Sequence, residues 1–184
     1  MERKRKMSIM VRLLLMVIPT CLLMGVLMTL YSGWNMQKGM QKTTLDGLRS
    51  TDYAVLEMFE NVADGDYKQD AKGNVYRGEY KISDNNELAD YIKNKTDVDV
   101  TFFYGDTRVL TSLKDKKTGD RLIGTTASKE VTDKVLKNGK EYSDTGIVIN
   151  ERPYYGYYVP VKNSDDSIVG MVFVGSEGKD INAF

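Results

Sequence analysis

An uncharged apolar run near the start of the chain sets its organisation. The 19 residues from Leu13 to Tyr31 carry no charge. A helix of this length rises about 28 Å, which matches the hydrocarbon core of a bilayer. Tyr31 and Trp34 stand where aromatic side chains gather at a membrane interface. The pattern therefore predicts a transmembrane helix over residues 13–34.

The residues before this run predict its orientation. Residues 1–12 hold five basic residues and one acidic residue, a net charge of +4. Because basic flanks stay in the cytoplasm, we expect a basic cytoplasmic tail over residues 1–12 and an extracytoplasmic chain after Trp34. A cleaved signal peptide, or a lipoprotein anchor at Cys21, would share the basic start. The apolar run is longer than the roughly 7–15 residues of a signal peptide, which favours an uncleaved anchor in the cell membrane.

Residues 35–63 have apolar positions at helical spacing. The steps between these positions are mostly three, four and seven residues, with polar residues between them. The pattern predicts a long amphipathic helix that continues from the membrane span and packs on its own domain. A helix of this kind can also pair with a second subunit, so a homodimer through it is expected. The apolar positions are Met36, Met40, Leu45, Leu48, Val55, Phe59 and Val62.

The clearest period-two pattern covers residues 98–113. Apolar residues alternate over 98–104 and again over 107–113, with Gly105-Asp106 between them. This arrangement predicts a β-hairpin with a two-residue turn. A regular hairpin would place Arg108 opposite Phe103.

The other segments complete an α+β pattern. Residues 64–74 and 114–120 are turn-rich, a capping box of Asp84 and Glu87 predicts one short helix, and Ser128 caps another. The predicted class is α+β, with a long N-terminal helix, a central antiparallel sheet of about five strands and short flanking helices. Further strands are expected over residues 75–82, 142–150, 154–161 and 168–174.

Composition excludes several functional classes. The 26 basic and 26 acidic residues cancel, which gives no overall field for nucleic acid. The chain has no histidine, and its one cysteine lies in the apolar run. Histidine bases, Ser-His-Asp triads, thiol nucleophiles and nearly all zinc or copper sites are thereby excluded. We expect no enzyme activity, no catalytic residue, no metal and no cofactor.

Arginine, threonine and tyrosine side chains are the candidate ligand contacts. An arginine fork matches a carboxylate with two hydrogen bonds, and tyrosines combine aromatic area with a hydroxyl group. Strand alternation puts Tyr155 and Tyr157 on one face and Tyr154 and Tyr158 on the other. Core packing and surface ion pairs are the alternative roles. The candidates for a small carboxylate or amino-acid ligand are Tyr104, Arg108, Thr111, Arg121, Thr125, Tyr142, Tyr155 and Tyr157.

Several short motifs occur in a characteristic order. They are residues 108–113 (RVLTSL), 119–125 (GDRLIGT), 139–142 (GKEY), 158–161 (YVPV) and 168–175 (IVGMVFVG). Together they resemble the single Cache (PAS-like) extracytoplasmic sensor domains of bacterial methyl-accepting chemotaxis proteins and sensor kinases, over roughly residues 35–178. The resemblance implies a central antiparallel sheet backed by the long helix, with a small-molecule pocket on the opposite face.

The resemblance also implies roles for two residues. In related citrate and dicarboxylate sensors, an arginine on this strand and a polar residue three positions later hold the ligand carboxylate, and Arg108 and Thr111 match in position. Those sensors often have histidine where Thr111 stands, which argues against a tricarboxylate ligand. Strict alternation would put the two residues on opposite faces, unless a bulge re-aims one of them.

Family members continue into an exit helix, a second membrane span and a cytoplasmic signalling module. Residues 179–184 are expected to begin that exit helix, in a fragment of a longer receptor or a truncated gene product. The expected function is the sensing region of a chemoreceptor. Alternatives are the input domain of a histidine kinase or cyclic-dinucleotide enzyme, a stand-alone membrane-anchored binding protein and, least favoured, an exported enzyme.

Overall fold

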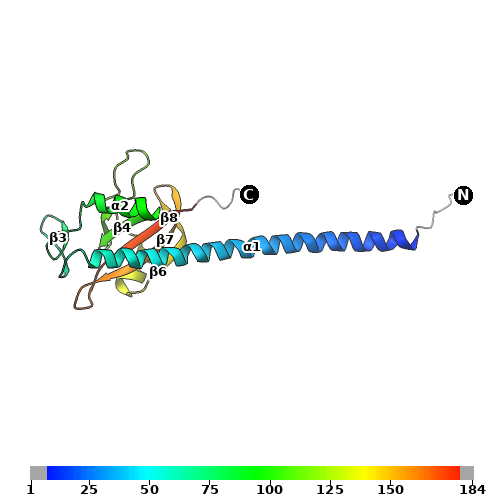
Figure 1. The fold of residues 1–184 in the computed structure, drawn as a ribbon, viewed down its shortest axis with the longest axis horizontal. Coiled ribbons are helices and arrows are strands. Elements are labelled where there is room, and N and C mark those ends of the chain that lie inside the picture. The colour runs from blue at the N-terminus through cyan, green and yellow to red at the C-terminus, as the bar shows by residue number, and fades with distance from the viewer. Residues whose placement is uncertain (1–7, 179–184) are drawn as a thin grey trace. The chain divides into compact units, whose positions relative to one another are not determined.

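The computed structural model describes residues 8–178. The start of the predicted basic tail (1–7) and the predicted exit helix (179–184) lie outside the described residues. The chain forms two compact units, one ending at Lys42 and the other beginning at Thr43. Helix α1 (Ile9–Glu60) contributes residues to both (Figure 1).

The N-terminal unit is the apolar part of α1. Among the described residues, α1 is the one helix that is long and apolar enough to cross a membrane, and its most apolar stretch is not buried at all. Its large apolar side chains from Ile9 to Leu30 are exposed. An apolar surface of this extent is typical of a helix surrounded by lipid, which agrees with the predicted span over residues 13–34.

The C-terminal unit contains a five-stranded antiparallel sheet in the order β5-β4-β8-β7-β6. Short hairpins join β4 to β5, β6 to β7 and β7 to β8. Strand β4 also pairs with β8, which is distant in sequence, and this pairing places β8 at the centre of the sheet. The predicted α+β class and central sheet are therefore confirmed. The strands are β4 (Asp99–Tyr104), β5 (Thr107–Thr111), β6 (Tyr142–Ile149), β7 (Arg152–Lys162) and β8 (Ile168–Glu177).

The predicted strand over residues 75–82 is wrong. These residues and part of the predicted turn region form a separate three-stranded sheet of β1 (Tyr67–Gln69), β2 (Val75–Arg77) and β3 (Tyr80–Lys81). The chain reverses at Gly78, which has a φ of 54°. A Cβ atom there would lie 2.0 Å from the carbonyl oxygen of Asp64, so only glycine fits this turn.

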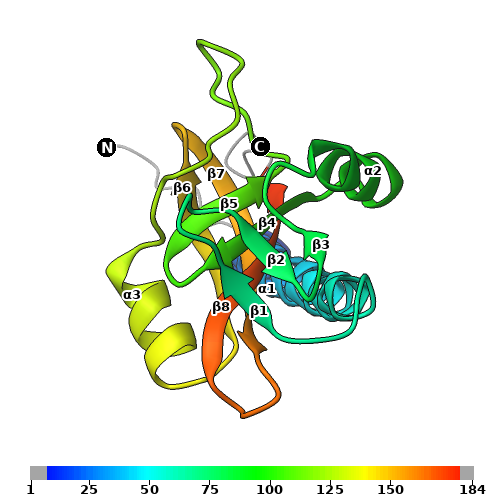
Figure 2. The ribbon, with the colours of Figure 1, turned by 90° about the vertical axis from the view of Figure 1, so that its left-hand side faces the viewer.

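Helices cover both faces of the central sheet. On one face, the second half of α1 packs against β4, where the rings of Phe59 and Phe102 meet edge to face at 5.0 Å. On the other face, Val131 and Val135 pack against Phe173. Figure 2 shows α3 and α2 on opposite sides of the sheet. The short helical segments are α2 (Asn86–Thr96), α3 (Lys129–Val131) and the π-helical η1 (Thr132–Lys137).

Helix α2 begins one residue later than the capping box predicts. The side chain of Asn85 accepts a hydrogen bond from the backbone N–H of Leu88 at 3.2 Å and so caps the helix. Asp84 instead has a left-handed backbone and pairs with Lys81 at 2.8 Å. The predicted helix is confirmed, but its N-cap is Asn85.

A bulge interrupts the hairpin of β4 and β5. Phe103 pairs with Arg108, as predicted, but the next pair on that side is Phe102 with Leu110. Val109 is therefore an extra residue between two pairs, and the alternation of side chains shifts by one. As a result Arg108 and Thr111 share one face of the sheet, which strict alternation would have prevented.

Candidate functional site

A cavity of about 330 Å³ lies between the sheet and the helical segment that begins at α3. Strands β4 to β7 supply its floor, and residues 126–131 supply a wall. Arg108 faces this cavity beside its strand partner Phe103, and Ser128 lies in the cavity wall where its hydroxyl group caps α3. This is the face opposite to α1, where the sequence resemblance placed a pocket.

Arg108 is the deepest charged group of the cavity. The residue is 8% exposed, and its guanidinium lies over the Phe103 ring at 5.1 Å. It donates one hydrogen bond to the Thr125 hydroxyl at 2.5 Å and a long one, 3.5 Å, to the Leu122 carbonyl. Its Nε atom is buried without a hydrogen-bond partner, and no carboxylate of the described chain forms an ion pair with it.

Burial therefore leaves the Arg108 charge poorly compensated, and it lowers the pKa of this guanidinium from its ordinary value. A buried charge without a counter-ion is unfavourable, and a bound anion would supply the missing partner. A carboxylate suits the free edge of a guanidinium because it can accept two parallel hydrogen bonds.

The backbone holds Arg108 in place. Its N–H donates to the carbonyl of Thr125 at 2.9 Å, and its own carbonyl accepts from Gly124 at 2.8 Å. Thr107 and Thr126 form a bridge in the same loop. The loop after Arg121 thus pairs with β5 as an irregular edge. These backbone hydrogen bonds fix the position of Arg108 before any ligand binds.

Tyrosines form the aromatic wall of the cavity. Tyr142 and Tyr158 are partners across β6 and β7, with ring centroids 6.2 Å apart. Burial raises the pKa of both groups, that of Tyr142 to about 12, so both hydroxyls remain protonated near neutral pH. The Tyr158 hydroxyl makes no hydrogen bond with the described part of the chain, and it is available as a donor to a ligand.

Two carboxylates also line the cavity nearer to solvent. Asp144 is half-buried and accepts the backbone N–H of Gly146 at 2.8 Å, and Glu130 is exposed on α3. After burial, their charges are the next causes of the raised Tyr142 pKa, which places both near its hydroxyl. The cavity therefore has a cation at depth and anions towards its opening.

Three of the eight candidate residues meet here. Arg108 and Tyr142 line the cavity, and Thr125 bonds to Arg108. The other five lie outside it. Thr111 bonds to the Thr101 hydroxyl at 2.7 Å, and Arg121 pairs with Asp90 at 2.6 Å. Tyr104, Tyr155 and Tyr157 pack in the hydrophobic cluster on the α1 face.

Sequence reasoning missed Tyr158, Phe103 and Asp144. Alternation correctly separated Tyr158 from Tyr155 and Tyr157, but it did not indicate which set faced the cavity. The available signal was the β6–β7 hairpin, because Tyr142 pairs with Tyr158 across it. Among the described residues, no group of three or more cysteine or carboxylate side chains is arranged to hold a metal ion.

Comparison with known proteins decides the family. The model of the family described as single cache domain 3 matches residues 71–184, more than half of the chain. The chain belongs to this family. The match confirms the sequence-based resemblance and covers the Cache domain from just after β1 onward, without α1.

Structural comparison gives a weaker likeness. The crystal structure of the E. coli DcuS sensor domain is 18% identical, with a TM-score of 0.36, over 50% of this chain and 65% of that one. This chain thus spans less than two thirds of the length of that structure. No curated protein matches the chain.

Proposed function

We propose that the chain is the extracytoplasmic sensing region of a membrane-anchored chemoreceptor, and that the Arg108 cavity binds a small ligand bearing a carboxylate. Cache sensor domains bind small molecules and are typically extracytoplasmic. The observation that carries the ligand class is the buried Nε of Arg108, which has no partner in the described chain. A histidine kinase or a cyclic-dinucleotide enzyme with this input domain is the alternative receptor type.

The distribution of charge favours an amino-acid-like ligand over a dicarboxylate. A carboxylate bound at Arg108 places the rest of the ligand towards Asp144 and Glu130. A second carboxylate there would be repelled, whereas an ammonium group would be attracted. We infer that the ligand is bound and released unchanged, because Cache sensor domains act by binding small molecules.

The ligand class is tested by thermal unfolding of the full chain in detergent micelles. Amino acids, acetate, succinate, citrate and polyamines are screened at one concentration. We expect amino acids to raise the melting temperature by several degrees and polyamines to have no effect. The Arg108→Met variant should lose the response, whereas Arg152→Gln, which removes an arginine outside the cavity, should keep it. An undiminished response in Arg108→Met would contradict the proposed site.

The orientation is tested by labelling in cells. Lys72 is exposed in a turn of the Cache domain. Lys72→Cys in a Cys21→Ser background should react with a membrane-impermeant maleimide in intact cells. Labelling only after lysis would place the domain in the cytoplasm.

We also propose a homodimer through α1. Light scattering of the detergent-solubilised chain should give a protein mass of twice 20.8 kDa. A mass of one chain at all concentrations would exclude the dimer.

A further inference from the structure

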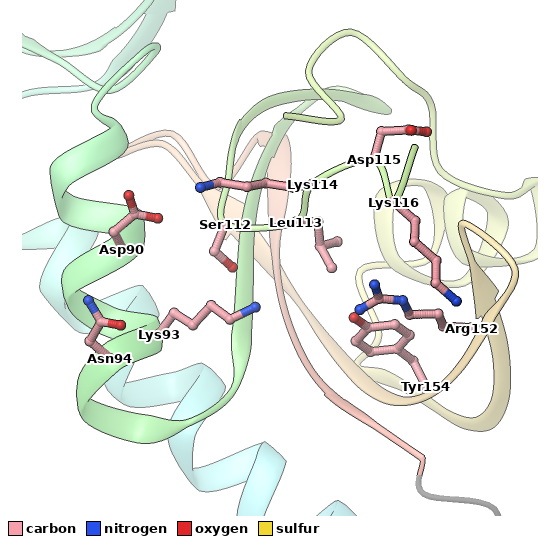
Figure 3. A pocket seen from close by; sticks show the side chains of 10 residues that line it. All are labelled: Asp90, Lys93, Asn94, Ser112, Leu113, Lys114, Asp115, Lys116, Arg152 and Tyr154. Carbon is pink, nitrogen blue, oxygen red and sulfur yellow. The ribbon is translucent and has the colours of Figure 1, made fainter. Parts of the chain in front are cut away.

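A second cavity lies at the end of the sheet where β5 ends and β7 begins. Its volume is about 510 Å³, and its walls come from α2, residues 112–116 and the first residues of β7. Figure 3 shows Lys116 and Arg152 approaching this space beside Tyr154, with Lys93 on α2 across from them. None of these residues lines the Arg108 cavity, so the two cavities can be tested separately.

The acidic side chains in the wall already have partners. Asp90 accepts a hydrogen bond from Arg121 at 2.6 Å, which lowers the pKa of Asp90. Asp115 accepts the backbone N–H groups of Lys117 and Thr118 at 2.8 and 2.9 Å. Neither carboxylate needs a further cation.

A third carboxylate, Asp99, lies beneath the wall. It is buried and accepts hydrogen bonds from Lys93 at 2.6 Å, Ser112 at 2.7 Å and Tyr154 at 3.2 Å. Its charge is thus balanced by Lys93. The same contacts fix three side chains of the cavity wall in position.

The basic side chains are not balanced in the same way. Arg152 pairs with Glu177 at 3.2 Å, but Lys114 and Lys116 form no ion pair with any residue between positions 8 and 178. Lys114 influences Asp90 only as a weaker, secondary charge. Lys114 and Lys116 are thus the cations of the wall without an ion-pair partner in the described chain. Figure 3 shows their side chains on opposite sides of the cavity, so an anion held in it would be attracted by both charges.

We propose that this second cavity binds a phosphate-type anion, either free in solution or as a lipid headgroup. A phosphate group presents several acceptor oxygens, which ammonium groups contact as point charges and a guanidinium contacts with two hydrogen bonds. Lys114 and Lys116 provide the first kind of contact, and Arg152 provides the second. Because both lysines are exposed, the affinity should fall as salt is added.

The test uses the full chain in phosphatidylcholine nanodiscs at low salt, with pyrophosphate as the free probe in calorimetric titration. The Lys114→Ser/Lys116→Ser variant should bind pyrophosphate about tenfold more weakly, as expected for the loss of two exposed ion pairs. Lys72→Ser/Lys117→Ser removes the same charge from exposed positions outside the cavity and should bind normally. Arg108→Met should also bind normally, because it alters the other cavity.

A second arm identifies the source of the anion. Nanodiscs that contain phosphatidylglycerol should slow hydrogen exchange over residues 93–116 if a headgroup is the ligand, and the double lysine variant should lose this protection. Binding in either arm that depends on Lys114 and Lys116 supports the proposal. Equal binding by the variant and the wild type in both arms, or no binding in either, overturns it.

Discussion

Glu141 and Arg49 form a two-bond ion pair that joins the Cache sheet to α1. The Arg49 Nε and Nη2 atoms donate to the two carboxylate oxygens at 2.8 and 3.0 Å. The hydroxyls of Tyr53 and Tyr157 donate to the same carboxylate. Glu141 immediately precedes Tyr142, so the residue that holds α1 and a residue that lines the ligand cavity are neighbours on the chain.

This pairing predicts a specific acid sensitivity. The hydrogen bonds from Arg49, with those from the two tyrosines, lower the pKa of Glu141 from 4.5 to about 2. A carboxyl group whose pKa is lowered by folding stabilises the fold at a pH above the pKa that it has in the unfolded chain. This contribution is lost as the pH falls through the pKa that the group has in the folded protein. Stability should therefore decrease between pH 4.5 and about 2.

Substitution of Glu141 isolates the effect. Glu141→Gln should lower the free energy of unfolding near pH 7 by roughly 1 kcal/mol, a value discounted for the partial exposure of the pair. Its melting temperature should depend less on pH below 4.5 than that of the wild type. Identical pH profiles for the two proteins would show that the ion pair contributes nothing.

Asp52 has the opposite effect on stability. It is fully buried on α1, and neither carboxylate oxygen has a hydrogen-bond partner among the described residues. Burial, with a smaller effect of Glu141, raises its pKa well above 3.8. Since the unfolded chain releases this proton more easily, Asp52 destabilises the fold increasingly as the pH rises above about 4.

Asp52→Leu should therefore stabilise the domain at pH 7 by about 1–3 kcal/mol, because it removes a buried polar group without a partner. Asp46→Leu changes an exposed aspartate of the same helix and should have little effect. Denaturant unfolding at pH 4 and pH 7 checks this. The gain from Asp52→Leu should be larger at pH 7, and a loss of stability would reveal a partner for the carboxyl group.

Arg108 and Arg121 should respond differently to the same substitution. Arg121→Met breaks the ion pair with Asp90 and a hydrogen bond of 2.7 Å to the Thr111 carbonyl, so it should lower stability and leave ligand affinity unchanged. Arg108→Met removes an uncompensated buried charge, so it should abolish binding with little loss of stability. Parallel measurements of melting temperature and ligand affinity compare the two. Loss of binding in Arg121→Met, with binding retained in Arg108→Met, would instead place the ligand site at Arg121.

The two faces of β7 can be distinguished by removing single hydroxyls. Tyr158→Phe should weaken ligand binding about three- to tenfold, the effect of one hydrogen bond, and should preserve stability. Tyr155→Phe alters the α1 face and should leave affinity unchanged. Calorimetric titration of both variants gives the comparison. A larger effect of Tyr155→Phe would indicate that the ligand binds on the α1 face.

Local patterns in the sequence were sufficient for the hairpin of β4 and β5, the pairing of Arg108 with Phe103 and the short helices. They were insufficient where a single residue changes the strand register or reverses the chain. The extra residue Val109 is set by the pairing of β5 with β4, and the turn at Gly78 by its close approach to the backbone of Asp64, and neither feature is visible in a period-two pattern. For the same reason, period-two alternation separated the tyrosines of β7 into two sets but could not assign either set to the cavity.

The most direct test of the ligand site compares one ligand with and without its carboxylate charge. The amino acid that gives the largest thermal shift is titrated into the full chain by calorimetry, together with its primary amide. We predict that the amide binds about 10- to 100-fold more weakly to the wild type, because a charged hydrogen-bond partner of Arg108 is lost. In Arg108→Met the two ligands should bind equally weakly. Equal affinity of the acid and the amide for the wild type would contradict carboxylate recognition by Arg108.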